Sequence, residues 1–271
     1  MKKVRILVCQ YIIRHLDIES NLKKFERIIK MNQYFKPDLV IFPEEALTGL
    51  LYGHYDLALK QNDPVLARLS LLAKKYRIYL VPGSFARIIG KKRYNSTCLI
   101  SPQGEILGYA NKRCLWSSEK LFVDNGMESK VIKTIIGRIA LQICADIFSS
   151  KISSGYRKTK PDIIINTSLW SQEDKSNCRK NVPEILEFTQ TEVLARSRAL
   201  ENQAYFIFCN YADKLTVKAK SGREFKFTSI GHSMIVDPYG NIVAKASSNH
   251  EQIIFSELDI TKCHWAKYSY V

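Results

Sequence analysis

The sequence predicts an α/β fold built from two similar halves, and two observations carry this prediction. Apolar runs of about five residues alternate with longer segments of helical periodicity, and Pro or Gly separates them. In addition, Lys36–Ile41 is echoed by Lys160–Ile165, and Ser101–Ile106 is echoed by Asp237–Ile242 in the same chain order. We therefore expect two sheets packed face to face with helices outside, although chance recurrence of common turns would also produce such echoes.

The elements of the first half follow this alternation. Val4–Gln10 is expected to form a buried strand, and Ser20 is expected to cap the next helix. The apolar face of that helix consists of Leu22, Phe25, Ile28 and Ile29. Asp63 and Pro64 are typical of the start of a second helix. Further strands are expected at Leu39–Phe42, Ile78–Val81, Ser96–Ser101 and Glu105–Gly108.

The second half repeats the order of helix and strand. A long helix from Pro183 to about Ala204 precedes an apolar strand at Tyr205–Asn210, just as a helix precedes Ile78–Val81. No linker or low-complexity segment interrupts the chain. We therefore expect residues 1–271 to form a single domain.

Composition limits the classes of protein to consider. With 271 residues, of which 46% are hydrophobic and 25% charged, the chain can bury roughly three-quarters of its unfolded surface. It contains no run of about 18 uncharged apolar residues, so a membrane span is not expected. The N-terminus resembles a signal start, but its apolar stretch soon meets Gln10 and Arg14, and no small-residue cleavage site follows. The sequence thus predicts a cytoplasmic protein.

The seven cysteines are scattered along the chain and most lie within apolar runs, where cysteine usually acts as a small buried hydrophobic residue. They are Cys9, Cys98, Cys114, Cys144, Cys178, Cys209 and Cys263. None forms a C-x-x-C pair, and no histidine lies at zinc-ligand spacing from them. We expect neither a disulfide framework nor a metal site.

The net charge of +15 raises the question of a nucleic-acid partner. The basic residues occur in short groups, such as Lys74, Lys75 and Arg77, without interleaved exposed aromatic residues or a recognisable nucleic-acid module. The pattern favours solvated basic faces and no nucleic-acid partner, with steering of an anionic substrate as a further use of the charge. Strong salt-dependent binding to DNA would support the alternative.

Two polar motifs follow predicted strands. Glu44, within Leu39–Gly49, comes directly after Ile-Phe-Pro at the rim of the core, a position that suits a general base. A glutamate that faces water at a helix start is the alternative. Lys112, within Gly108–Lys120, lies between a strand and an aromatic segment, where its ammonium could stabilise an oxyanion. An ordinary surface lysine is the alternative.

A third motif, Gly137–Phe148, ends a buried strand at Cys144. A thiol at such an elbow can gain thiolate character from a helix N-terminus and a nearby cation. A cysteine packed in the core is the alternative. No histidine is spaced to pair with Cys144 in a papain-like motif, so that mechanism is disfavoured.

Taken together, the glutamate after proline, a lysine 68 residues on and a cysteine 32 residues beyond it resemble the nitrilase, or carbon–nitrogen hydrolase, superfamily. The resemblance runs through nearly the whole chain. The further segments that match the family's pattern are Tyr94–Ser96, Ala195–Asn202, Gly231–Ser233 and Asp237–Asn241.

The resemblance implies a four-layer α-β-β-α sandwich, often dimerised, with amidase or carbamoylase activity and no cofactor. It further implies that Glu44 is the general base, Cys144 the nucleophile and Lys112 the oxyanion stabiliser. Glu119 matches a further glutamate that orients the site, and the N–H group of Ala145 would be a second oxyanion donor. The implied partners are a small amide or carbamoyl substrate and a second copy of the chain.

The chain departs from the family pattern at two places near these motifs. Ala145–Lys151 lacks the aromatic residue, proline and glutamate that often accompany the cysteine, and Cys114 stands where histidine is frequent. Both changes alter the pocket wall, so the substrate cannot be transferred from one branch of the family. The candidate substrate-binding residues are His54, Trp116, Ala145 and Trp170. Burial in the core is the alternative for both tryptophans, and a surface loop is the alternative for His54.

The favoured function is hydrolysis of a small-molecule amide or N-carbamoyl bond through a cysteine thioester, with release of ammonia or an amine. Transfer of the acyl group from the thioester to an amine is one alternative, and a non-catalytic binding protein is another. The presence of all four matching residues argues against a binding protein. They are Glu44, Lys112, Glu119 and Cys144. Nitrile hydrolysis belongs to a smaller branch and is disfavoured.

Overall fold

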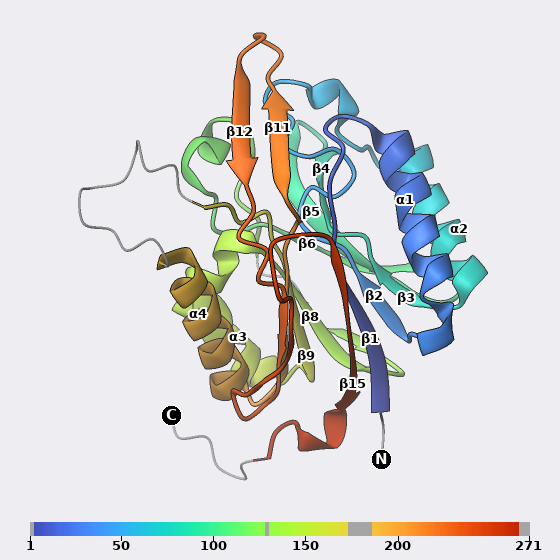
Figure 1. Cartoon of the computed structure of the whole chain (residues 1–271), viewed down its shortest axis with the longest axis vertical. Helices are drawn as coiled ribbons and strands as arrows, with labels where there is room; N and C mark the ends of the chain where they lie inside the picture. Colours follow the sequence, from blue (N-terminus) through green and yellow to red (C-terminus); the bar gives the residue numbers. More distant parts are fainter. Residues whose placement is uncertain (1–2, 128–129, 173–185, 266–271) are drawn as a thin grey trace.

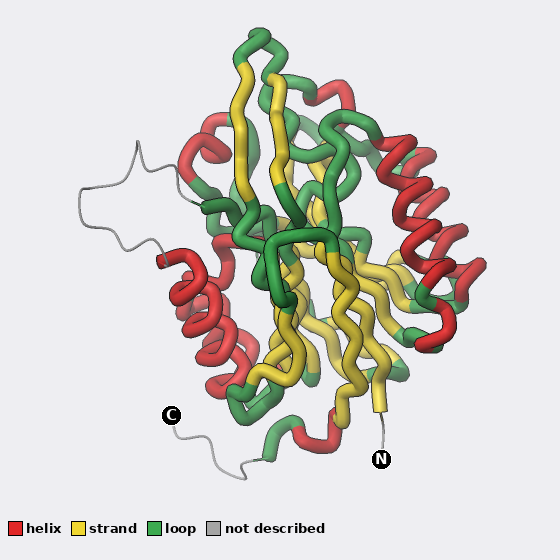
Figure 2. Tube along the Cα trace, viewed as in Figure 1, coloured by secondary structure: helices red, strands yellow, loops and turns green. Residues whose placement is uncertain are grey.

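Two β-sheets lie face to face at the centre of the molecule, and pairs of helices cover their outer faces (Figure 1; Figure 2). The computed structural model describes residues 3–127, 130–172 and 186–265. The arrangement is the expected four-layer α-β-β-α sandwich, so the predicted fold class is confirmed.

The first sheet has the strand order β15-β1-β2-β3-β5-β4, with β6 paired to β5. Its strands are β1 (Lys3–Gln10), β2 (Leu39–Ile41), β3 (Tyr79–Val81), β4 (Ser84–Ile89), β5 (Lys92–Ile100), β6 (Ile106–Asn111) and β15 (Gln252–Asp259). Its outer face is covered by α1 (Ile18–Met31) and α2 (Pro64–Tyr76) (Figure 1). Because β1, β2 and β3 run parallel, their carboxyl ends meet at one edge of the sheet, where Glu44 follows β2.

The second sheet has the order β14-β13-β10-β9-β8-β7. Its strands are β7 (Ile132–Thr134), β8 (Gly137–Ile143), β9 (Ile163–Thr167), β10 (Tyr205–Cys209), β13 (Met234–Val236) and β14 (Ile242–Lys245). The helices α3 (Ser150–Thr159) and α4 (Leu186–Asn202) cover its outer face (Figure 1). None of the helices in the described ranges combines the length and the apolar character needed to cross a bilayer.

Short elements complete the described chain. A hairpin of β11 (Lys214–Lys218) and β12 (Glu224–Thr228) projects beyond the sandwich (Figure 1). The short 3₁₀ helices are η1 (Gln33–Phe35), η2 (Tyr55–Leu57), η3 (Ser117–Leu121), η4 (Cys144–Phe148) and η5 (Ile260–Lys262). Two of them, η3 and η4, follow the strands that lead to Lys112 and Cys144.

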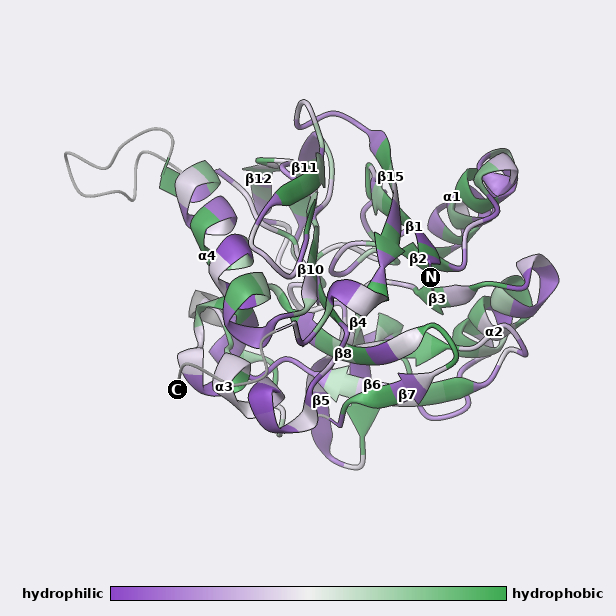
Figure 3. Ribbon diagram, turned by 90° about the horizontal axis from the view of Figure 1, so that it is seen from below, coloured by the Kyte–Doolittle hydropathy of each residue, from purple (hydrophilic) through white to green (hydrophobic). Residues whose placement is uncertain are grey.

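Successive side chains of a strand point to opposite faces of its sheet, so each strand contributes apolar residues to two hydrophobic cores. Along β1, Leu7 packs toward α1 and α2, whereas Val8 packs between the two sheets against residues such as Ile207. A third cluster joins the second sheet to α3 and α4, with Phe206 at its centre. Hydrophobic residues accordingly line the strands between the helix layers (Figure 3).

The internal repeat is present in three dimensions. Lys36–Asp38 and Lys160–Asp162 each begin with a lysine in the left-handed conformation, with φ 47° in both, and each leads into a central strand. Each closing aspartate accepts a hydrogen bond from the backbone N–H of an arginine on a neighbouring strand, Arg5 in one half and Arg138 in the other. The first of the two sequence echoes therefore reflects equivalent structure.

The second echo is a pair of matching turns. In Ser101–Glu105 and in Asp237–Asn241, the N–H of the first residue donates to the carbonyl of the fifth at 2.8 Å. Gly104 and Gly240 occupy the same place, with φ 86° and 82°, a conformation that favours glycine. The two halves are thus built alike at both predicted positions.

Three sequence-based boundaries are wrong by three residues or more, and one of them is the end of the strand expected at Glu105–Gly108, since β6 continues to Asn111. The N-cap of α1 is Asp17, not Ser20, because the Asp17 carboxylate accepts the N–H of Ser20 at 2.9 Å. The strand expected from Ser96 begins at Lys92, because β5 pairs along its length with β4, a strand that the apolar pattern did not reveal. The expected start of the long helix at Pro183 lies outside the described residues.

Candidate active site

The glutamate motif and the lysine motif meet, since Lys112 lies between the side chains of Glu44 and Glu119. Its ammonium is 2.8 Å from Glu44 Oε1 and 2.8 Å from Glu119 Oε2. Lys112 and Glu44 are each only 2% exposed. A buried ammonium is stable only when such partners offset the loss of hydration. The structure therefore removes two of the alternatives, the surface lysine and the water-facing glutamate.

The Glu44 carboxylate is held by donors on both oxygens. Asn95 Nδ2 and Lys112 Nζ each donate to Oε1 at 2.8 Å, and the backbone N–H of Leu169 donates to Oε2 at 2.8 Å. The backbone N–H of Glu44 in turn donates to the carbonyl of Ser168 at 3.2 Å. These contacts join residues from both sheets and fix the direction of the carboxylate.

Cys144 stands at a strained elbow between β8 and η4. Its φ of 46° lies in the left-handed region, which costs energy for a residue with a side chain. Asn166 Nδ2 donates to the carbonyl of Cys144 at 3.2 Å and holds this conformation. Cys144 is half-buried at this position, as the first residue of η4. Strained residues of this kind concentrate at functional sites.

The charges around Cys144 act on its thiol and on Lys112 in opposite ways. Burial raises the pKa of the Cys144 thiol well above its usual value, the charge of Glu44 raises it further, and Lys112 opposes the rise. Burial alone would lower the pKa of Lys112, but Cys144, Glu44 and Glu119 outweigh it and raise that pKa. Lys112 therefore stays charged, and the thiol is protonated at rest and requires a base.

Asp146 connects the lysine segment to the cysteine segment. Its Oδ1 accepts the backbone N–H groups of Arg113 at 2.9 Å and Cys114 at 2.7 Å, while Oδ2 accepts that of Ile143 at 3.1 Å. Burial raises the pKa of Asp146, and these backbone hydrogen bonds oppose the rise. The three bonds lock the residue after Lys112 against the residue before Cys144.

Glu119 reaches the cluster from η3. Its Oε2 accepts the backbone N–H of Trp116 at 2.7 Å, and its carboxylate contacts Lys112 at the same time. Glu119 thus ties the short helix to the ammonium group. The family resemblance implies that Glu119 orients the site, and this role stays a prediction.

Glu45 is a further buried carboxyl group beside the cluster. Burial, with the charge of Glu44 as the next contribution, raises its pKa to about 8. Its backbone N–H donates to Ser84 Oγ at 3.1 Å, and the hydroxyl of Thr48 donates to its side chain at 3.4 Å. Glu45 is therefore neutral at pH 7.

The four expected substrate-binding residues lie in different surroundings. Ala145 is buried in the first turn of η4, where a backbone N–H has no acceptor within the helix. Trp170 is half-buried between Phe148 and Phe208, next to the Leu169 N–H that binds Glu44. His54 instead contacts the β11–β12 hairpin, through the carbonyl of Lys218 at 3.2 Å.

Trp116 does not pack in the core. It is 62% exposed, so the alternative of core burial is wrong for this residue. The backbone of Trp116 is engaged with Glu119, which leaves the indole directed outward.

The cysteines divide by burial. Cys9, Cys98, Cys209 and Cys263 are buried, as expected for small hydrophobic residues. Cys114 and Cys144 are half-buried, and Cys178 lies outside the described residues. Within the described ranges, no group of three His, Cys, Asp or Glu side chains is placed to hold a metal ion.

Sequence reasoning did not assign a role to Asn95 or Asn166. Both are buried polar residues within strands, with exposures of 3% and 0%. The signal in the sequence is a polar residue within an apolar strand, because a buried side-chain amide needs hydrogen-bond partners. Asn166 follows three isoleucines in β9, and Asn95 interrupts the inner face of β5.

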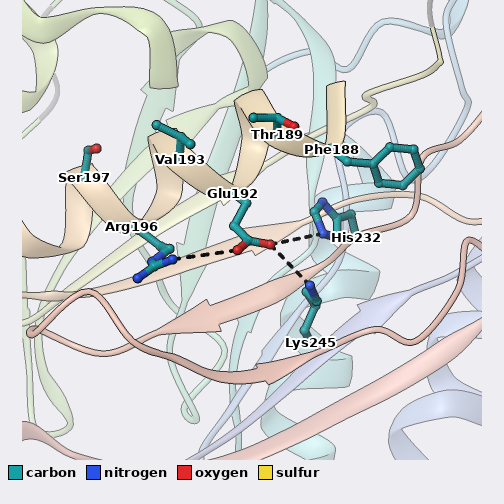
Figure 4. A pocket seen from close by; sticks show the side chains of 8 residues that line it. All are labelled: Phe188, Thr189, Glu192, Val193, Arg196, Ser197, His232 and Lys245. Atoms are coloured by element: carbon teal, nitrogen blue, oxygen red, sulfur yellow. Dashed lines mark hydrogen bonds and ion pairs between the residues drawn. The ribbon is translucent and has the colours of Figure 1, made fainter. Parts of the chain in front are cut away.

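A cavity of about 600 Å³ opens elsewhere, on α4 (Figure 4). Glu192 lies at its centre and contacts Lys245 at 3.2 Å, His232 at 3.7 Å and Arg196 at 3.8 Å. Burial lowers the pKa of His232, Lys245 adds to that effect, and Glu192 opposes it. None of the residues that line this cavity belongs to the Glu44–Lys112–Cys144 cluster.

The four-layer fold and the buried cluster of a glutamate, a lysine and a strained cysteine define a cysteine-dependent hydrolase of the α-β-β-α class. The model of the carbon–nitrogen hydrolase family matches residues 5–268. The chain therefore belongs to the carbon–nitrogen hydrolase family.

Individual relatives agree with this assignment. The chain is 26% identical to the omega-amidase NIT3 of Saccharomyces cerevisiae over 95% of this chain and 88% of that protein. It is 25% identical to the omega-amidase NIT2 of Xenopus tropicalis over 96% of this chain and 90% of that protein.

Solved structures show the same fold. The yeast Nit3 crystal structure, a member of branch 10 of the nitrilase superfamily, has a TM-score of 0.80 at 24% identity, covering 95% of this chain and 90% of that chain. A carbon–nitrogen hydrolase from Helicobacter pylori has a TM-score of 0.83 at 20% identity, covering 96% and 90%. The amidase from Nesterenkonia sp. AN1 in complex with acrylamide has a TM-score of 0.78 at 18% identity, covering 96% and 92%.

Proposed function

We propose that Cys144, Glu44 and Lys112 carry out the hydrolysis of a small-molecule amide through a thioester on Cys144. The chain is a cysteine-dependent amidase that acts on carbon–nitrogen bonds other than peptide bonds. The observation that supports the residue roles best is the buried Lys112 ammonium, which contacts Glu44 and Glu119 beside the protonated Cys144 thiol.

In the first half of the reaction, Glu44 takes the proton of the Cys144 thiol, and the sulfur attacks the amide carbonyl. Lys112 and the backbone N–H of Ala145 stabilise the negative oxygen that forms. When the carbon–nitrogen bond breaks, the protonated Glu44 passes its proton to the nitrogen, and ammonia leaves. A thioester between the acyl group and Cys144 remains.

In the second half, Glu44 takes a proton from a water molecule that attacks the thioester carbonyl. The carbon–sulfur bond breaks, the Cys144 sulfur recovers a proton, and the carboxylic acid product leaves. The raised pKa of the Cys144 thiol makes the sulfur basic, which favours this return of the proton. Glu119 positions the Lys112 ammonium in both halves.

The proposed substrate is a linear molecule that carries a terminal primary amide. The names of two relatives, both omega-amidases, support this choice. N-carbamoyl amines are the second substrate class to test, because their scissile carbon–nitrogen bond would undergo the same attack.

The test is ammonia release from terminal amides and N-carbamoyl amines, with wild type, Cys144→Ala and Cys114→Ser. Cys114 is also half-buried, so its variant controls for thiol loss in general. We expect wild type and Cys114→Ser to release ammonia and Cys144→Ala to release none. Ammonia release by Cys144→Ala at the wild-type rate would contradict the assignment of the nucleophile.

We propose further that the chain forms a homodimer through the face that carries α4. Leu200, Tyr239 and Trp265 are each more than 40% exposed. The Tyr239 and Trp265 rings are tilted at 41° with their centres 5.8 Å apart, and the adjacent Gly240 lies against Leu200. An exposed apolar patch of this kind favours association.

A single domain over residues 1–271, a cytoplasmic location and the absence of a nucleic-acid partner stay predictions. Fractionation of cells tests the location, limited proteolysis tests the domain, and salt-dependent binding to DNA tests the partner.

A further inference from the structure

A second cavity, of about 380 Å³, lies on the side of the first sheet that α2 covers. Residues at the start of α2, on β4 and on β6 line it, and none of them belongs to the Glu44–Lys112–Cys144 cluster. Arg87 lines the cavity from β4, where it follows Phe85 by two residues and so shares the helix-covered face of that strand. The cavity therefore contains an arginine for which the proposed reaction has no role.

The Arg87 side chain is held in place by an aromatic ring. Its guanidinium carbon lies 3.6 Å from the centre of the Tyr109 ring on β6, which is a stacking distance. In the part of the chain that the structure describes, this guanidinium has no carboxylate partner, and its Nε is buried without a hydrogen-bond acceptor. A cation that is positioned but unpaired costs free energy to hold, and a bound anion would offset this cost.

The two terminal nitrogens of Arg87 are the atoms that a ligand can reach. Arg87 as a whole is half-buried, and only its Nε is fully enclosed without a partner. Nη1 and Nη2 hold their N–H donors in one plane, a geometry that matches the two oxygens of a carboxylate. Asn62 and Ser70 also line the cavity, and neither side chain has a hydrogen-bond partner among the described residues. They offer further donors in the same cavity.

The other charged residue of the lining is Asp63. Its Oδ1 accepts the backbone N–H of Val65 at 3.0 Å as the N-cap of α2, so this carboxylate already has a structural partner. One guanidinium beside one carboxylate favours a ligand with a single negative charge, because Asp63 would repel a dianion more strongly. Leu66 and Ile106 form apolar walls, which suit a hydrocarbon body on the ligand.

We propose that this cavity is a binding site for a small monocarboxylate with an apolar body. The ligand carboxylate pairs with Nη1 and Nη2 of Arg87, which the Tyr109 ring holds in position. The hydrocarbon body packs against Leu66 and Ile106. Because the site is separate from the cluster that attacks the amide, this ligand is additional to the substrate.

The test uses 4-fluorobenzoate, a monocarboxylate whose ring supplies the apolar body, and measures its Kd by fluorine NMR at pH 7. Arg87→Gln should weaken binding about 10- to 100-fold because it removes the charged donor pair, and Arg87→Lys should restore part of the loss. Lys60→Gln is the matched control, since Lys60 is an exposed cation of the neighbouring loop that does not line the cavity. It should change the Kd by less than twofold.

Two further ligands test the proposed chemistry on the wild-type protein. 4-Fluorobenzyl alcohol keeps the ring but lacks the charge, and it should bind at least tenfold more weakly than 4-fluorobenzoate. 4-Fluorophenyl phosphate is mostly a dianion at pH 7, and it should also bind more weakly because of Asp63. Tighter binding of either ligand than of 4-fluorobenzoate would overturn the assignment of a monocarboxylate.

The catalytic site is controlled by alkylation of Cys144 with iodoacetamide. The alkylated protein should bind 4-fluorobenzoate as the unmodified protein does, whereas loss of binding would assign the ligand to the catalytic site. At ten times its Kd, the ligand should raise the melting temperature of wild type by about 2 °C and that of Arg87→Gln by less than about 1 °C.

Circular dichroism shows whether each variant is folded. Weaker binding by Arg87→Gln with a native spectrum supports the site. No binding by wild type, or binding that persists unchanged in Arg87→Gln, would overturn it. If Arg87→Gln does not fold, Arg87→Lys decides, and binding by Arg87→Lys within twofold of wild type would overturn the role of the planar donor pair.

Discussion

Replacement of Lys112 by methionine should destabilise the fold as well as abolish activity. The ammonium interacts with Glu44 and Glu119, each at 2.8 Å, and at an effective dielectric constant of about 20 each attraction is worth about 6 kcal/mol before desolvation. Removing one partner of a buried ion pair usually costs about 3–5 kcal/mol net, because an uncompensated charge remains. Lys112→Met leaves two carboxylates together without a cation, so we expect a loss in this range.

The expected loss of unfolding free energy can be measured as a decrease in the melting temperature. For 271 residues, the entropy of unfolding is about 0.6 kcal/mol per kelvin, so 3–5 kcal/mol corresponds to a decrease of about 5–9 °C. Differential scanning calorimetry at pH 7 measures the decrease. Lys3→Met is the control, because the Lys3–Glu257 pair has a similar length of 3.0 Å but is exposed, and it should shift the melting temperature by less than about 2 °C.

A double variant tests the reason for the loss. Lys112→Met with Glu119→Gln removes one of the two surplus carboxylates and should regain part of the lost stability. The reasoning is refuted if Lys112→Met melts within 2 °C of wild type, or if the double variant is no more stable than the single one.

Three further predictions concern Glu45, Cys144 and the dimer. Because burial raises the pKa of Glu45 from 4.5 to about 8, its neutral form stabilises the fold at low pH, and this stability is lost as pH rises through about 8. Relative to Glu45→Gln, wild type should therefore lose up to about 1.4 kcal/mol per pH unit between these values in urea unfolding, whereas equal pH dependence would contradict the raised pKa. Glu119→Gln should move the pH profile of Cys144 alkylation by iodoacetamide to lower pH, because the charge of Glu119 is one cause of the raised pKa of the Cys144 thiol. A move of the profile to higher pH would contradict this effect of Glu119. Leu200→Glu with Tyr239→Glu should convert a dimer into a monomer in light scattering, and a wild-type monomer would exclude the proposed interface.

The sequence by itself was enough to predict an α/β fold built from two similar halves, because the signals for strands and turns depend on neighbouring residues in the chain. A lysine before Pro-Asp adopts the same backbone in both halves, at Lys36–Asp38 and Lys160–Asp162, and a glycine takes the fourth place of the matching turns. Burial of alternate residues along β1 likewise follows from the strand period. The order of Glu44, Lys112 and Cys144 along the chain was enough to indicate the family.

Only the tertiary structure decided how these residues meet. The Leu169 N–H binds Glu44 across 125 residues of chain, and Asn95 binds it across 51, so neither contact has a local signal. The left-handed backbone at Cys144 depends on Asn166, a residue of the next strand.

The sequence also did not predict which large side chains are exposed or which charged side chains form ion pairs. Trp116 is exposed although its side chain is large and apolar, because Glu119 holds its backbone at the start of η3. Arg93 stays without a carboxylate partner within the described residues, because Asp124 engages its backbone while Tyr55 holds its side chain. The composition gives the number of charged residues but not their partners. Ion pairs depend on distances that the packing of the two sheets and their loops creates.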